Sequence, residues 1–158
     1  MAAIQTIEPR IPNIAGTVPE ALAAMLALGK AAMRNRGVPR TTHTLVHLRA
    51  SQINGCSVCV GMHTRELREA GESEERIATV AAWRESPYFS DAERTALALA
   101  EAATRLADRP DPVPDEVWDE AARHYADEAL ASLVLTIAAI NAWNRLKVNT
   151  RQPAGSWQ

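Results

Sequence analysis

Residues 48–63 read LRASQINGCSVCVGMH, and this stretch carries most of the information about the fold and the chemistry of the chain. The pair Asn54-Gly55 is typical of a helix end, and a new helix is predicted to begin near Cys56. Cys56 and Cys59 are three residues apart, and His63 follows four residues after Cys59. At 3.6 residues per turn, these three side chains project from one face of the predicted helix.

The two cysteines have the spacing of a redox-active pair. Residues one helical turn apart have Cα atoms about 5 Å apart, which a disulfide can bridge. The free N–H groups and the dipole at a helix start stabilise a thiolate and lower the thiol pKa. His63 is placed to take the proton of Cys59 or to pair with its thiolate. We therefore expect Cys56 and Cys59 to form an intrachain disulfide on oxidation.

Two other interpretations fit the same residues. Cys56 and Cys59 would be ordinary buried residues if His63 is a hydrogen-bonded core histidine. The pair and His63 would also supply three zinc ligands, but a structural zinc site usually has four, often as two separate pairs. The chain has no second cysteine pair, and His43 or His47 could be a fourth ligand only if the fold happened to bring it to the site. We therefore predict no metal site.

The sequence on both sides of this stretch indicates an all-α fold. Ala and Leu, which favour helices, supply most of the apolar residues, and aromatic residues make up only 4% of the chain. Apolar residues at helical spacing and helix-ending Gly and Pro residues predict about seven helices, with the cysteine pair at the start of the third. Their expected positions are 20–36, 41–53, 56–71, 73–86, a helix opened by a capping box at Ser90 and Glu93, a short helix after Pro114, and 127–148.

Length and charge limit the functional classes. A chain of 158 residues predicts one domain, with an irregular segment at 1–17, a helical domain at 18–150 and a loose tail at 151–158. The net charge of −2 and mixed signs argue against nucleic-acid binding. No signal peptide is recognised, and the apolar run 129–140 is shorter than the roughly 20 residues of a membrane span. We expect a cytoplasmic protein without membrane attachment.

The motifs resemble the alkyl hydroperoxidase D-like branch of the carboxymuconolactone decarboxylase family. They are LRASQINGC (48–56), CxxCxxxHT (56–64), AWRESPY (82–88) and INAWNRL (140–146). The resemblance implies an all-α fold, a homotrimer or homohexamer, and reduction of hydroperoxides without a cofactor. By position it implies that Cys59 is the peroxidatic cysteine, Cys56 the resolving cysteine and His63 the relay histidine. It further implies an external dithiol reductant of the lipoyl or thioredoxin-like type.

One position departs from the family pattern. The family relay has a glutamate twelve residues before the first cysteine, where this chain has Thr44. A hydroxyl is a poor general base at neutral pH because its pKa is far too high. Two residues are candidates to replace the glutamate: His47, one turn after Thr44, and Glu66, three residues after His63. The favoured interpretations are a partly exposed helix histidine for His47 and a solvated surface glutamate for Glu66.

The late motif and the tryptophans receive simpler interpretations. Asn141, Trp143 and Asn144 are predicted to pack and cap the last helix. Trp83 and Trp143 are candidates for an apolar entrance that admits an alkyl or lipid peroxide.

Three functional hypotheses follow. The first is a thiol-dependent peroxidase that reduces alkyl or hydrogen peroxide through the cysteine pair, as a peroxiredoxin-type antioxidant enzyme. The second is a redox-sensing or partner-binding scaffold, in which the disulfide changes an interface; the threonine at position 44 favours this alternative. The third is a decarboxylase or lactone-processing enzyme of the wider family, whose chemistry needs no cysteine pair.

Overall fold

The computed structural model describes residues 6–34, 36–107 and 109–156, and every regular element in these ranges is helical. The predicted all-α class is therefore confirmed. Seven α-helices have five residues or more, and the four-residue α1 and a 3-10 turn, η1, complete the described elements. Their bounds are α1 Ile14–Thr17, α2 Pro19–Ala32, α3 Arg40–Asn54, α4 Ser57–Glu69, α5 Glu74–Ala78, η1 Thr79–Ala82, α6 Asp91–Thr104, α7 Asp115–His124 and α8 Asp127–Asn149.

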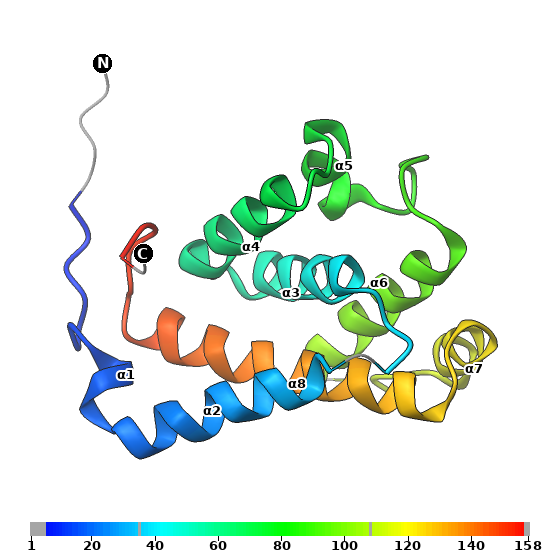
Figure 1. Ribbon diagram of the computed structural model, residues 1–158. Coiled ribbons are helices and arrows are strands. Elements are labelled where there is room, and N and C mark those ends of the chain that lie inside the picture. Colours follow the sequence, from blue (N-terminus) through cyan, green and yellow to red (C-terminus); the bar gives the residue numbers. More distant parts are fainter. Residues whose placement is uncertain (1–5, 35, 108, 157–158) are drawn as a thin grey trace.

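Helix α3 is the central element of the molecule. It packs against α4, α6 and α8, and α2 lies along α8 at the base of the view in Figure 1. Its side chains enter three apolar clusters: Val46 joins the cluster formed with α6, α7 and α8, Leu45 joins the one beneath α4 and α5, and Ala50 joins the one around the cysteines. Because α3 is covered on several sides, the turn at its C-terminal end is held firmly in place.

The capping box predicted at the start of α6 is confirmed. Ser90 accepts a hydrogen bond from the Glu93 amide, and the Glu93 carboxylate accepts one from the Ser90 amide. Reciprocal bonds of this kind satisfy two amide donors that a helix start would otherwise leave unpaired.

Several predicted boundaries are wrong. Helix α2 ends at Ala32 instead of continuing to Arg36, and the segment 73–86 forms the short α5 followed by η1. Helix α6 ends at Thr104, and Leu106 beyond it is exposed. The expected irregular segment 1–17 contains α1, although its first five residues lie outside the described ranges.

The C-terminal segment is not loose throughout. Gln152 is buried, and its side-chain amide donates a 2.8 Å hydrogen bond to the carbonyl of Ile11. The Arg10 amide donates to the carbonyl of Thr150 in the same region. The two ends of the described chain are therefore tied together beside the N-terminal end of α4.

Helix α8 is long and apolar enough to cross a membrane by length and composition alone. Of its most apolar window, 56% is buried inside the protein, where it packs against α2, α3 and α6. A core helix of a globular domain is buried in this way, and the contacts with α2, α3 and α6 explain the apolar composition of α8.

Candidate active site

The cysteine pair lies at the junction of α3 and α4. Gly55 ends α3 in the left-handed region at φ 67°, and Cys56 occupies the N-cap position of α4. The Cys59 amide donates a 3.4 Å hydrogen bond to Cys56 Sγ. Both thiols are buried and free of a disulfide in this structure. The predicted placement at a helix start is correct, with Cys56 at the cap and Cys59 in the first turn.

The two thiols have opposite acidities. Hydrogen bonds from the side chain and amide of Cys59, together with the charge of Lys147 and the amide of Asn144, lower the pKa of Cys56 to about 7, although burial opposes this. The hydrogen bond to Cys56 and burial both raise the pKa of Cys59. In the reduced pair, the negative charge therefore resides on Cys56 and the remaining proton on Cys59.

His63 is paired with Glu66 on the same helix. His63 Nδ1 lies 2.9 Å from Glu66 Oε2, and this contact is the main reason that the pKa of Glu66 is lowered. An ionised carboxylate only accepts hydrogen bonds, so Nδ1 carries the proton and Nε2 of a neutral His63 has a free lone pair. Nε2 is buried and, among the described residues, makes no hydrogen bond. The Glu66 side chain is 43% exposed, as expected for a surface residue, and it also contacts His63.

His47 is partly exposed on α3, as predicted, and it also contacts the site. Its ring centroid lies 4.7 Å from that of His63. Burial, followed by the nearby His63 and His43, holds the pKa of His47 well below its usual value. His43 is fully buried, and its Nδ1 lies 2.9 Å from Thr136 Oγ1 on α8. A neutral His47 is thus packed against the ring of His63.

Thr44 has a local role in the structure. It is buried, and its hydroxyl donates a 3.2 Å hydrogen bond to the carbonyl of Arg40, one turn earlier in α3. Thr44 and Glu66 line the same small surface pocket between α3 and α4. The carboxylate that pairs with the histidine therefore comes from α4, opposite the position at which the family pattern has a glutamate on α3.

Helix α8 supplies two residues that the sequence interpretation did not assign to the site. Asn144 is fully buried, its amide nitrogen donates a 3.0 Å hydrogen bond to Ser51 Oγ, and its amide lowers the pKa of both Cys56 and Cys59. Lys147, one turn further on, is only 4% exposed. The sequence predicts that Asn144 packs and caps α8, and it assigns no role to Lys147. Only the packing of α8 against α3 brings these side chains to the cysteines.

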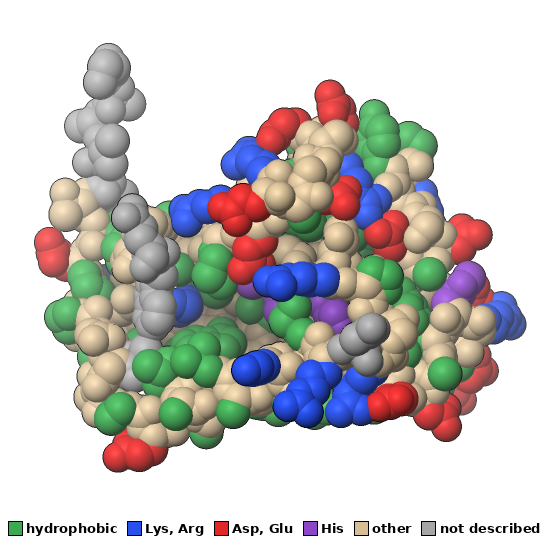
Figure 2. Space-filling view, viewed as in Figure 1, with side chains coloured by type: hydrophobic (Ala, Val, Ile, Leu, Met, Phe, Trp, Pro, Cys, Tyr) green, Lys and Arg blue, Asp and Glu red, His purple; other side chains and the backbone are tan. Residues whose placement is uncertain are grey.

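Two cavities reach the pair from different directions. A cavity of about 200 Å³ is lined by Cys59, His63, His47 and Lys147, together with the mainly apolar residues Leu26, Gly29, Met62, Ala139, Ile140 and Trp143. Figure 2 shows a hollow on this face above α2, with histidine atoms beside it and apolar side chains along its lower edge. A more polar cleft of about 530 Å³ reaches Cys56 and Lys147 between the two chain ends, and is lined also by Glu8 and Arg151.

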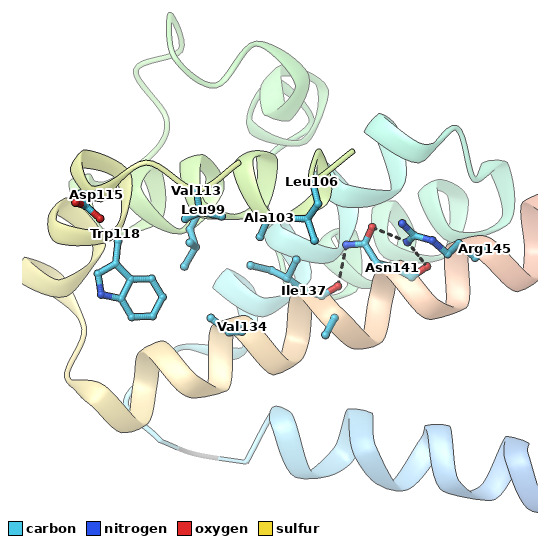
Figure 3. Close-up of a pocket in the computed structure, with 11 residues that line it drawn as sticks. Leu99, Ala103, Leu106, Val113, Asp115, Trp118, Val134, Ile137, Asn141 and Arg145 are labelled. Atoms are coloured by element: carbon cyan, nitrogen blue, oxygen red, sulfur yellow. Dashed lines mark hydrogen bonds between the residues drawn. The ribbon is translucent and has the colours of Figure 1, made fainter. Parts of the chain in front are cut away.

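Neither Trp83 nor the larger apolar cavity belongs to this site. Trp83 is buried, and its indole N–H donates a 3.0 Å hydrogen bond to Glu101, so only Trp143 of the two candidate tryptophans lines the cysteine cavity. A cavity of about 540 Å³ lies between α6, α7 and α8, and Figure 3 shows Leu99 and Trp118 on its walls. None of the residues that line it is a cysteine or a histidine.

The site is therefore a buried dithiol with a histidine–carboxylate pair, set in an all-helical domain. The chain belongs to the carboxymuconolactone decarboxylase family, whose model matches residues 19–102. It is 38% identical over 138 residues to an uncharacterised protein, YdfG, of Bacillus subtilis, which covers 87% of this chain and 92% of the relative.

Solved structures show the same fold. One is an Agrobacterium tumefaciens protein of unknown function, provisionally assigned as the antioxidant defence protein AhpD. It is 37% identical with a TM-score of 0.86, over 93% of this chain and 98% of that one. The debrominase Bmp8 superposes with a TM-score of 0.80 at 22% identity, over 94% of this chain and 78% of that one. At that identity the similarity shows the fold alone.

Proposed function

We propose that this protein is a thiol-dependent peroxidase that reduces organic hydroperoxides at Cys59 and is recharged by an external dithiol. The observation that carries the proposal is the small, mainly apolar cavity that Cys59 and His63 both line, with His63 Nε2 left without a hydrogen bond among the described residues. A cavity with mostly apolar walls suits an alkyl or aryl group attached to the peroxide better than water-like hydrogen peroxide.

The first step oxidises Cys59. His63 Nε2 accepts the Cys59 proton while the sulfur attacks the distal oxygen of the peroxide, and the O–O bond breaks. The departing alkoxide takes this proton from His63 and leaves as an alcohol, so that Cys59 becomes a sulfenic acid. Glu66 keeps the proton on Nδ1, which leaves the lone pair of Nε2 available for this transfer.

The second step uses the low pKa of Cys56. Its thiolate attacks the sulfur of the Cys59 sulfenic acid and forms the disulfide, and the displaced hydroxide takes a solvent proton to become water. A dithiol then reduces the disulfide and is itself oxidised, which restores the Cys56 thiolate and the Cys59 thiol. The cleft at Cys56 gives this reductant its approach. Cytoplasmic dithiols of the lipoyl or thioredoxin-like type are the proposed source of electrons.

Single-cysteine variants test the assignment of roles. Cys56→Ser treated with cumene hydroperoxide should accumulate a sulfenic acid at Cys59, trapped by a sulfenic-acid reagent and located by mass spectrometry. Cys59→Ser should form none, and neither variant should turn over with dithiothreitol. Sulfenic acid on Cys56 in the Cys59→Ser variant, with none in the other, would reverse the two roles.

Turnover by the wild-type protein tests the activity itself. With dithiothreitol as reductant, it should consume cumene hydroperoxide catalytically and yield the Cys56–Cys59 disulfide when the reductant is withheld. A disulfide that forms without catalytic turnover would contradict the peroxidase proposal and favour the redox-sensing scaffold.

A further inference from the structure

Helix α8 presents a polar pair to the cysteines from inside an otherwise apolar helix. Asn144 and Lys147 are three residues apart and therefore share one face of α8. Asn144 is fully buried and Lys147 is 4% exposed. Lysine is almost never buried to this degree unless an opposite charge or hydrogen-bonding groups compensate it.

The position of Lys147 relates it to both sulfurs. It lines the apolar cavity together with Cys59 and the polar cleft together with Cys56. Its charge lowers the pKa of both thiols. Burial lowers the pKa of Lys147 itself to about 8, and the two cysteines act in the opposite direction. The lysine and the pair therefore stabilise each other's charged forms.

The orientation of Asn144 is determined by its neighbours. Asn54, the last residue of α3, donates a 2.9 Å hydrogen bond to Asn144 Oδ1. This bond turns the Asn144 amide nitrogen towards Ser51 and the sulfurs. A donor and a cation from the same face of α8 thus converge on the pair, while α4 supplies its own helix start.

We propose that Lys147, with Asn144 beside it, is a positioning residue for the cysteine pair: its buried ammonium holds the negative charge of the reduced pair and makes the pair a stronger oxidant. The physical reason is that a dithiol whose reduced form is stabilised has a less negative reduction potential. This inference rests on the redox role in the proposed function and deepens it, because it identifies what adjusts the reactivity of that site.

The charged and titratable groups around Lys147 come from several elements. His47 on α3 and His63 on α4 face it across the apolar cavity, and Glu8 and Arg151 border the cleft on its other side. A test must therefore separate the effect of Lys147 from that of these groups. The chain has only one other lysine, the exposed Lys30 on α2, which provides an internal control.

The first test uses the wild-type protein with isotope-labelled lysine. The two lysine signals are titrated by NMR in the dithiol form and in the disulfide form, which has no thiolate. We expect the titration of Lys147 to move upwards by about one pH unit on reduction, a tenfold change in its proton affinity, while that of Lys30 stays in place. Identical Lys147 titrations in the two forms would overturn the proposal.

The second test compares Lys147→Met, Lys147→Arg and the control Lys30→Met. The methionine variant should lose thiolate ultraviolet absorbance near neutral pH, be alkylated by iodoacetamide roughly tenfold more slowly at about pH 6, and have a more negative reduction potential. The arginine variant should retain most of the wild-type behaviour because it keeps the charge, and Lys30→Met should match the wild type. A folded methionine variant with a wild-type thiolate titration would overturn the proposal.

If Lys147→Met does not fold, as judged by circular dichroism, the titration of the wild-type lysines decides alone. Neither test uses a peroxide. A protein without peroxide turnover whose lysine and thiol titrations are coupled would contradict the proposed function and leave this inference standing. Peroxide turnover by a protein whose lysine and thiol titrations are not coupled would support the proposed function and overturn this inference.

Discussion

At the residue scale, the two cysteines of one motif differ because their surroundings differ. Cys56 caps α4 and receives hydrogen bonds, so its thiolate is stabilised, whereas Cys59 is a donor to Cys56 and is fully buried. Under the proposed function, this difference assigns the attack on the peroxide to Cys59 beside His63 and the closing of the disulfide to the Cys56 thiolate.

The pH dependence of thiol reactivity follows from this asymmetry. Because the pKa of Cys56 is lowered to about 7, the reduced protein should react with iodoacetamide faster as the pH rises through about 7 and reach a plateau above it. Alkylation rates measured from acidic to alkaline pH check this. Cys56→Ser should lack the step near pH 7, and a step that persists in this variant would contradict the assignment.

Removing His63 should affect catalysis more than removing its partner. His63→Ala should lower peroxide turnover by roughly 10²–10⁴-fold, because it removes the group that accepts the Cys59 proton. Glu66→Gln should cause a smaller fall, since the imidazole remains but is less firmly oriented. Steady-state turnover with dithiothreitol measures both effects.

Glu69→Gln is the matched control, because Glu69 is exposed on the same helix. It should retain wild-type turnover. Equal losses in the Glu66 and Glu69 variants would mean that the overall charge of α4 matters, and that the contact with His63 does not.

At the scale of elements, the turn between α3 and α4 determines where the thiols lie. Gly55 allows α3 to end in a left-handed conformation, so that Cys56 can follow immediately as the N-cap of α4. The sequence predicted this junction because Asn-Gly followed by the cysteine motif is a strong local signal. It did not predict the ends of α2 or the break between α5 and η1, because these depend on packing against other helices.

Gly55→Ala tests the importance of this turn. The site of the new Cβ is open, with no neighbouring atom within 4 Å, so the effect comes from the backbone conformation at φ 67°. The substitution should destabilise the protein by about 1 kcal/mol, as expected for a residue with a Cβ in the left-handed region. Urea unfolding measures the change in the free energy of unfolding.

Gly61→Ala provides the opposite case in the next helix. Gly61 lies within α4, and its Cβ position is also open. Alanine there should stabilise the protein by roughly 0.5–1 kcal/mol through helix propensity. A Gly55 variant as stable as the Gly61 variant would show that the left-handed turn is unimportant.

At the scale of the whole molecule, a single chain leaves large apolar side chains uncovered. Singly exposed apolar residues are normal, but Leu106, Trp118 and Val134 line the cavity of Figure 3 together. Leu135 is also exposed on α8, and Leu26 and Leu28 are exposed on α2.

We predict a homo-oligomer, a trimer or a hexamer as the family resemblance implies, that covers part of this surface. Light scattering at micromolar concentration should give a mass several times 17.2 kDa. Val134→Glu should weaken the assembly if α8 contributes to the interface, whereas Glu69→Gln should leave it intact. A mass near that of one chain for the wild-type protein would contradict the prediction.

The sequence by itself determined the helical class, the junction at Gly55, and the placement of Cys59 and His63 one turn apart in the helix that Cys56 caps. These features depend on residues within a few turns of each other, where helix geometry and turn chemistry fix the relation between side chains. The family was also indicated at this level, and the match to residues 19–102 confirms it.

Only the tertiary structure decided how the rest of the site is assembled. Glu66 pairs with His63 in a contact that is partly shielded because α4 packs against α3. The spacing of three residues between them allowed this contact but did not establish it. Asn144 and Lys147 reach the thiols because α8 packs against α3, nearly ninety residues later in the chain. No local pattern encodes such a contact, since burial of the apolar faces of α3 and α8 is what brings their polar residues together.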